Sequence, residues 1–235
     1  MLTIMRREFN SYFTSPIGYI YLSVFYILSG FFFFYNTLLY DTTDMSSLFS
    51  SLFTISMFLI PILTMRLLSE EKKQKTDQLL LTSPVSLFSL VMGKFLSALL
   101  VYILGVCVTL LYAIVLASFT SIDWAVFFGH FIGTILLGVA LVAIGMFLSS
   151  MTESQVIAAV SGFAVMLLLM MIDPLASYVG TSTFLGKALD GISFSTRYNS
   201  FALGIIDLSD VLFFLSVSAI FMFFTIRVFE KRRWS

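Results

Sequence analysis

Six apolar stretches, each long enough to cross a lipid bilayer, take up most of this 235-residue chain. A bilayer core about 30 Å thick is crossed by about 20 apolar residues in a helix. Within lipid the backbone must satisfy its own hydrogen bonds, so each stretch is expected to form one spanning α-helix. The expected spans are Ile17–Tyr40, Leu48–Leu68, Phe95–Phe119, Trp124–Leu148, Val156–Ile172 and Val211–Val228.

The polar part of the chain is small. Hydrophobic residues make up 59% of the sequence and charged residues 11%, whereas soluble domains carry about 25% charge. The segments between spans are too short for a separate globular core, so a single membrane domain over residues 1–235 is expected. The formal net charge of zero favours no nucleic acid partner. The first span has 24 residues, longer than the apolar part of a signal peptide, about 7–15 residues, and is expected to be retained.

Lysine and arginine predict the orientation, because they stay on the cytoplasmic side when they lie close to span ends. With the N-terminus in the cytoplasm, eleven of the thirteen Lys and Arg residues fall on inner segments. Only Lys187 and Arg197 fall outside, both within residues 173–210. Both termini of this multi-pass protein are therefore expected to be cytoplasmic.

The sequence lacks the motifs of nucleotide and acid–base chemistry. The pairs Gly93-Lys94 and Gly186-Lys187 have no glycine-rich approach of the kind that cradles phosphate. The single histidine, His130, has no sequence partner for catalysis or metal binding and is expected to pack between helices or at the membrane interface. We expect no enzyme activity, no metal site and no cofactor bound by this chain. No Asp, Glu, Lys or Arg lies near the middle of a span, which argues against an ion-coupled carrier or a channel.

Small residues spaced by four predict close helix contacts. Gly129 and Gly133 form one such pair, and Ala158 and Gly162 form another. A subunit interface and a contact within the chain both remain open for each pair.

Two connections, residues 69–94 and 173–210, are longer than joining helices requires. In the first, Ser69 followed by Glu70 predicts the start of a helix, and Pro84 predicts its end. In the second, apolar residues alternate with polar ones and predict short interfacial helices, with a re-entrant hairpin as the alternative.

The first connection, SEEKKQKTDQLLLTSPVSLFSLVMGK, contains a Glu pair, a Thr-acid step, a leucine run, a Pro-x-Ser and a Gly-Lys. It resembles the cytoplasmic signature of ABC transporter type 2 permeases. The matching residues are Glu70, Glu71, Thr76, Asp77, Leu79, Leu80, Leu81, Pro84, Val85, Ser86, Gly93 and Lys94. Lys75 departs from the pattern, since many members have glycine there, and Asp77 replaces the usual Glu. These departures leave the local helix geometry open.

A second stretch, residues 196–216, is similar to the segment before the last span of gliding-motility-type permeases. The residues that carry this narrower resemblance are Phe201, Gly204, Ile206 and Asp207. It does not reveal a cargo.

The resemblance implies an all-α integral membrane protein with six transmembrane helices. It implies an amphipathic elbow over residues 1–16, a cytoplasmic coupling helix within residues 69–94, and outer re-entrant or interfacial helices within residues 173–210. The implied function is that of the permease subunit of a bacterial ABC exporter, which moves an unidentified substrate out of the cytoplasm by alternating access. ATP and Mg would be bound by separate ATPase subunits, and a second permease, identical or related, would complete the membrane part. An accessory envelope protein is a further candidate partner.

The same resemblance implies that the loop after the second span docks into the ATPase. The implied docking residues are Glu70, Glu71, Thr76, Asp77, Leu79, Leu80, Leu81 and Pro84. The charges from Glu70 to Lys73 are expected to lie exposed at the rim of the docking site, and the leucines are expected to enter it.

The resemblance also implies a substrate path between the second and fifth spans of two protomers, with Phe53, Met57 and Val165 as candidates. Two other functions stay open. One is a membrane scaffold whose residues 173–210 anchor an envelope complex without transport, and the other is an ion-coupled carrier.

Overall fold

The structure is a computed structural model that describes residues 1–40, 42, 44–75, 86–119, 121–179 and 183–234. Within these residues the chain forms helices and no strands. The helices are α1 Leu2–Thr14, α2 Pro16–Phe33, the π-helix η1 Phe34–Leu38, α3 Ser46–Thr64, α4 Arg66–Lys73, α6 Leu87–Val106, α7 Val108–Ala117, α8 Trp124–Met151, α9 Gln155–Val179, α10 Phe184–Ile192, α11 Phe194–Ala202 and α12 Leu208–Trp234.

Six segments of the described chain are long and apolar enough to cross a membrane, which confirms the expected number of spans. They are α2 with η1, α3 with α4, α6 with α7, α8, α9, and α12. The fourth and fifth spans form a tight hairpin, because α8 ends at Met151 and α9 begins at Gln155.

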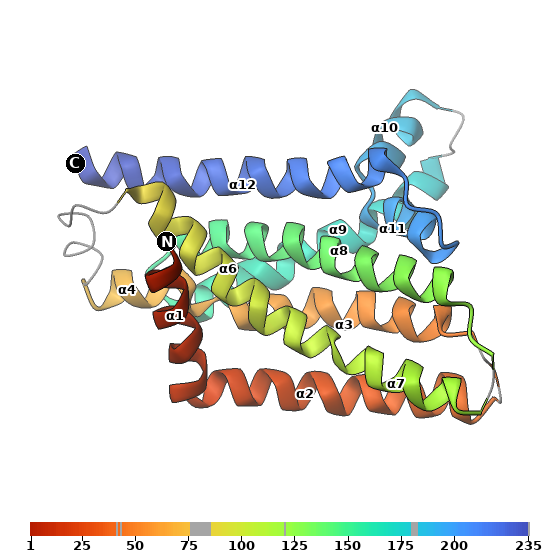
Figure 1. Ribbon diagram of the computed structural model, residues 1–235. Coiled ribbons are helices and arrows are strands. Elements are labelled where there is room, and N and C mark those ends of the chain that lie inside the picture. Colours follow the sequence, from red (N-terminus) through yellow and green to blue (C-terminus); the bar gives the residue numbers. More distant parts are fainter. Residues whose placement is uncertain (41, 43, 76–85, 120, 180–182, 235) are drawn as a thin grey trace.

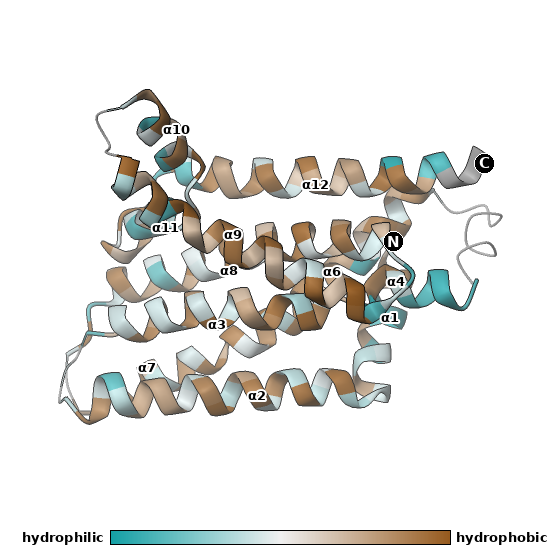
Figure 2. Cartoon of the chain, turned by 180° about the vertical axis from the view of Figure 1, so that it is seen from behind, coloured by the Kyte–Doolittle hydropathy of each residue, from teal (hydrophilic) through white to brown (hydrophobic). Residues whose placement is uncertain are grey.

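The spans run lengthwise beside one another, and the two ends of the bundle differ (Figure 1). One end holds α1, α4 and both chain termini, and we call it the terminal end. The other holds α10 and α11, and we call it the distal end. Hydrophobic residues run along the spans, whereas hydrophilic residues gather towards the two ends, on α1 and α4 and on α10 and α11 (Figure 2). This distribution suits a bilayer across the middle of the bundle.

Helix α8 lies at the centre and contacts α3, α4, α6, α9, α11 and α12. Of the 18-residue apolar stretch within each span, 61% is buried in α8 and 17% is buried in α9. Glycines in α8 admit bulky neighbours, because a Cβ on Gly138 would lie 2.1 Å from the ring of Tyr102. The apolar surface left on α9 must therefore contact lipid or a further subunit.

The glycines of both small-residue pairs serve contacts within the chain. A Cβ on Gly129 would lie 2.6 Å from the carbonyl oxygen of Phe201, and a Cβ on Gly133 would lie 2.8 Å from the Phe201 side chain. Gly162 lies in the same way against Pro61 of α3. These glycines bring α11 onto α8 and α9 onto α3.

The expected helix start at Ser69 is wrong. Helix α4 begins at Arg66, directly after α3, and runs through Ser69 to Lys73. The Ser69 hydroxyl donates to the carbonyl of Met65 one turn earlier, a bond that Ser can make inside a helix. The helix continues because Leu67 and Leu68 are buried, at 4% and 0% exposure, and their burial outweighs the local preference of Ser for a helix cap.

The short helices expected within residues 173–210 are confirmed as α10 and α11. They are fastened to their neighbours by polar contacts. Asp173 of α9 accepts hydrogen bonds from the hydroxyls of Ser193 and Thr196, and Arg197 lies 3.0 Å from Asp210 of α12. An interfacial or re-entrant position in the membrane stays a prediction.

Candidate functional site

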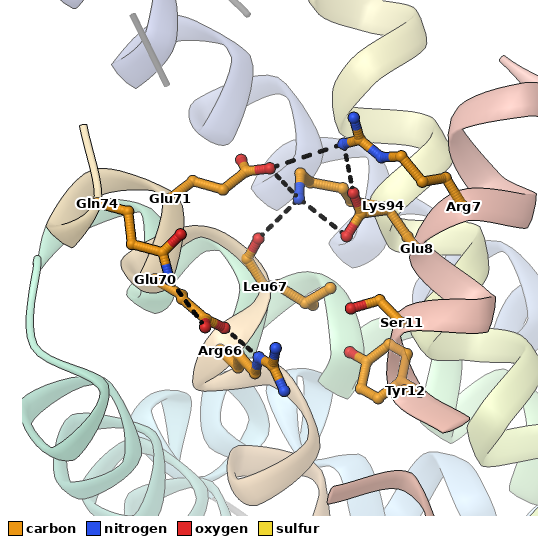
Figure 3. Close-up of a pocket in the computed structure, with 10 residues that line it drawn as sticks. All are labelled: Arg7, Glu8, Ser11, Tyr12, Arg66, Leu67, Glu70, Glu71, Gln74 and Lys94. Carbon is orange, nitrogen blue, oxygen red and sulfur yellow. Dashed lines mark hydrogen bonds and ion pairs between the residues drawn. The ribbon is translucent and has the colours of Figure 1, made fainter. Parts of the chain in front are cut away.

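At the terminal end, charged side chains converge on one buried lysine, Lys94 of α6, which is 1% exposed. Its ammonium lies 2.8 Å from a carboxylate oxygen of Glu71 in α4 and 3.1 Å from one of Glu8 in α1. It also donates a hydrogen bond to the carbonyl of Leu67 at 3.1 Å (Figure 3). With Arg7 these residues form what we call the Lys94 cluster, in which three helices meet.

The start of α6 places both residues of the Gly93-Lys94 pair against α1. The Ser86 side chain caps α6 by accepting a hydrogen bond from the Ser89 backbone N–H. A Cβ on Gly93 would lie 3.0 Å from the Ile4 side chain, so the missing side chain lets α1 pack closely. Gly93 therefore allows α1 to lie close to α6, and the next residue, Lys94, pairs with the Glu8 carboxylate of α1.

The charges of the Lys94 cluster balance, with two cations and two carboxylates. The Arg7 guanidinium lies 2.6 Å from Glu8 and 3.9 Å from Glu71. Burial opposes ionisation of Glu8, but the Lys94 ammonium and the Arg7 guanidinium outweigh it and hold the pKa of this carboxyl below its ordinary value. Lys94 thus has two carboxylate partners and one carbonyl partner, as a deeply buried lysine requires.

A cavity of about 470 Å³ opens beside the Lys94 cluster (Figure 3). Its lining also includes Ser11, Tyr12, Arg66, Leu67, Glu70 and Gln74. Arg66 pairs with Glu70 one turn later in α4, and the Tyr12 hydroxyl donates to the carbonyl of Leu63 at 3.1 Å. The lining is thus a set of paired charges that joins α1, α4 and α6. Nothing in it resembles a nucleophile with its base, and the described residues contain no group of His, Cys, Asp or Glu that could hold a metal ion.

A second set of polar contacts fastens α4 to the end of the central helix. The Ser149 hydroxyl of α8 accepts from the backbone N–H groups of Leu68 and Ser69, both at 3.2 Å, and donates to the carbonyl of Met65 at 3.0 Å. Lys72 donates to the carbonyl of Ser150. Helix α4 is therefore bound to α8 on one side and to the Lys94 cluster on the other.

The expectation of an exposed charged rim from Glu70 to Lys73 is wrong in part. Lys73 is exposed, but the Glu71 side chain is 17% exposed and Lys72 is 6% exposed. These two residues lie inward because α4 begins at Arg66 and is already packed against its neighbours at the point where the sequence predicted a new helix to start.

The other expected docking residues, Thr76, Asp77, Leu79, Leu80, Leu81 and Pro84, lie outside the described residues. The flanks of their segment are described. Helix α4 ends at Lys73 and α6 begins at Leu87, and Glu71 and Lys94 join these flanks.

The structure does not gather the three candidate path residues around one cavity of the described chain. The Phe53 ring lies 5.3 Å from the ring of Tyr198 in α11. Met57 is buried and lines a narrow crevice between α3 and α9 beside Met166, and Val165 is half-buried against the core. Their role in a path stays a prediction.

Sequence reasoning missed Arg7 and Glu8 as site residues and treated Lys94 as part of a loop. Two signals were available. Glu8 is the only acidic residue among the first sixteen, and Lys94 stands between apolar residues on both sides. A lysine within an apolar run is expected to be buried with a partner, but the sequence does not say which carboxylate that is.

Residues 2–234 match the model of the family described as ABC-2 family transporter protein. A search of curated proteins gave no match.

Proposed function

Because the chain belongs to the ABC-2 family of transporter proteins, we propose that it is the membrane-spanning subunit of a bacterial exporter driven by ATP. The family and the six spans make the chain a transmembrane transport component. The outward direction is supported by the resemblance of residues 69–94 to the loop of type 2 exporters.

The ATPase is a separate subunit in this proposal, and it binds the ATP and Mg. The absence of a phosphate-binding loop from the sequence supports this division of labour. The ATPase docks at the terminal end, on residues 74–86 between α4 and α6, with the leucines from Leu79 to Leu81 as its apolar contact.

The Lys94 cluster is the observation that carries this proposal. It joins the helix before the docking segment, through Glu71, to the helix after it, through Lys94, and ties both to α1 through Glu8. A displacement of the docking segment would therefore move α1, α4 and α6 together. Through Ser149 it would also reach α8, the central helix.

The terminal end faces the cytoplasm of a bacterial inner membrane in this proposal. The excess of Lys and Arg in the segments at this end supports that orientation. Two permeases complete the transporter, identical or related. The exposed apolar faces of α2, α9 and α12 offer surface for the second permease and for lipid, and Phe53, Met57 and Val165 remain the candidates for the path.

Leu80→Ala tests the docking site. A leucine that fills a groove of the ATPase contributes on the order of 2 kcal/mol to binding. The variant should therefore bind the ABC ATPase that co-purifies with the unmodified permease with roughly 30-fold lower affinity. Leu111→Ala, at a leucine of α7 that is 60% exposed, is the matched control and should retain the ATPase. Glu71 is unsuitable for this test, because its reversal to lysine would place a second cation beside Lys94.

The measurement is ATPase recovery in mild detergent, together with permease yield and the gel-filtration profile. Undiminished recovery with Leu80→Ala would refute docking at this segment. A loss of folded permease would assign Leu80 to folding and would equally contradict the proposal.

A further inference from the structure

The histidine that has no part in the proposed function lies at the distal end, in the contact between α3 and α8. His130 is 1% exposed. Its ring stacks on that of Phe49, with centroids 4.8 Å apart and planes 2° from parallel. This confirms the expectation that His130 packs between helices.

The hydrogen bonds around His130 determine which ring nitrogen carries the proton. The Ser46 hydroxyl donates its single hydrogen to a carboxylate oxygen of Asp44 at 2.5 Å. Its oxygen lies 3.2 Å from His130 Nε2, and since its hydrogen is already used, it must accept a hydrogen from that nitrogen. In the neutral imidazole, His130 Nδ1 then carries the lone pair, and this nitrogen is buried with no hydrogen-bond partner among the described residues.

His130 lines a cavity of about 220 Å³ together with two carboxylates, Asp44 and Asp123. The Ser46 hydroxyl and the Ser46 backbone N–H hold the pKa of Asp44 below its ordinary value. Asp123 caps α8 by accepting hydrogen bonds from the backbone N–H groups of Ala125 and Val126. The rest of the lining is apolar, and Met45 and Phe127 are part of it. Among the residues that the structure describes, no lysine or arginine lines the cavity.

We propose that this distal cavity binds a small primary ammonium group. An ammonium group supplies what the lining lacks, a positive charge for two carboxylates and an N–H donor for the lone pair of His130. An anion would be repelled. A metal ion is disfavoured because the described residues contain no group of three or more His, Cys, Asp or Glu close enough to hold one. The volume is below the roughly 300–1,000 Å³ of drug-sized pockets, which restricts the ligand to a headgroup or a small amine.

The ammonium could come from a soluble amine or from the headgroup of a lipid such as phosphatidylethanolamine. The chemistry is shared, and the experiment separates the two sources. The inference does not depend on the proposed function, because binding is measured without an ATPase and without transport.

Trp124 provides a fluorescent reporter. It follows Asp123, and its ring lies 6.0 Å from that of Phe127 in an edge-on contact. The only other tryptophan of the chain is Trp234, so Trp234→Phe leaves Trp124 as the only emitter. The detergent-purified variant is titrated with ethanolamine, and with choline at equal ionic strength. Choline carries the same charge but no N–H, so its half-saturating concentration should be at least roughly tenfold higher.

Isosteric variants test the lining. Asp44→Asn and Asp123→Asn keep the oxygen that accepts the local hydrogen bonds but remove the charge, and each should weaken ethanolamine binding roughly tenfold or more. Asp207→Asn is the matched control, because Asp207 is an exposed aspartate at the distal end that accepts from the backbone N–H of Ser209 and does not line the cavity. His130→Phe keeps a ring on Phe49 and should abolish the preference for ethanolamine over choline.

Nanodiscs identify the source. If the lipid supplies the ammonium, phosphatidylethanolamine should shift Trp124 emission relative to pure phosphatidylcholine and suppress the response to ethanolamine. If a soluble amine is the ligand, the ethanolamine titration should be the same in both bilayers. The proposal is overturned by an equal response to choline and ethanolamine, by binding that survives both aspartate substitutions, by a response to Zn²⁺ or Mn²⁺ alone, or by no response to any probe.

Discussion

Lys75 has a backbone conformation that lysine rarely adopts. Its φ is 55°, in the left-handed region, and it follows the last turn of α4, where its N–H donates to the carbonyl of Lys72. Glycine is the residue favoured at this position after a helix, because it has no Cβ to clash. The type 2 permeases that this chain resembles often have glycine there. Lys75, which departs from the family pattern in the sequence, therefore adopts the left-handed conformation that glycine favours.

Lys75→Gly should stabilise the folded protein by up to about 1 kcal/mol, since relief of the left-handed strain exceeds the added entropy of glycine in the unfolded chain. Lys73→Gly, at the last residue of α4, where φ is not positive, should instead destabilise it by up to about 1 kcal/mol. Chemical denaturation of both variants in detergent measures the difference. A destabilising effect of Lys75→Gly would show that the left-handed conformation does not form in solution.

At the scale of elements, one ion cluster joins α1, α4 and α6 in addition to their apolar contacts. Lys94 is the shared residue, and both of its carboxylate partners are less than one-fifth exposed. Removing one partner of a buried ion pair leaves charges that neither water nor protein satisfies. The joint is therefore stable only when all of its members are present.

Lys94→Met should lower the free energy of unfolding by about 3 kcal/mol, because it removes the buried cation and leaves Arg7 as the only cation of the Lys94 cluster beside Glu8 and Glu71. Adding Glu8→Gln and Glu71→Gln to Lys94→Met should recover most of the loss, since no uncompensated carboxylate then remains. Lys187→Met, at an exposed lysine of α10, is the control and should change stability little. If the triple variant is no more stable than the single one, the loss arises from packing and not from charge.

At the scale of the whole molecule, the two ends of the bundle differ in chemistry. The terminal end carries the Lys94 cluster and its cavity, and the distal end carries the acidic cavity at His130. The spans differ as well, because α3 and α8 are mostly buried while α2, α9 and α12 keep apolar surface exposed. A single copy of the chain thus has a packed core, and apolar side chains of α2, α9 and α12 remain exposed on its outer surface.

Cysteine labelling tests the orientation of the bundle. In a Cys107→Ala background, which removes the only native cysteine, a cysteine at Ser47 should react with an impermeant thiol reagent added outside intact cells. A cysteine at Gln74 should react only after the membrane is opened. Both positions are exposed and lie at opposite ends of the bundle. The reverse labelling pattern would put the terminal end outside the cell and exclude ATPase docking there.

The sequence by itself determined the number of spans, the tight hairpin before α9 and the presence of α10 and α11. These features depend on hydropathy and length within one segment, and lipid leaves a helix as the only structure for each long apolar stretch. The resemblance of residues 69–94 led to the family in the same way, because a motif is a local pattern.

Only the tertiary structure decided the course of α4 through Ser69, the pairing of Lys94 with Glu8, and the cavity at His130. Lys94 and Glu8 are 86 positions apart, and His130 lies 84 positions from Ser46. A charged or polar side chain within an apolar segment must find partners when it is buried, and the sequence states that need without naming the partner. Gly93 of α6 lets α1 pack closely, and Gly145 of α8 lets α3 pack closely. This packing of helices distant in sequence determines which partner each side chain finds.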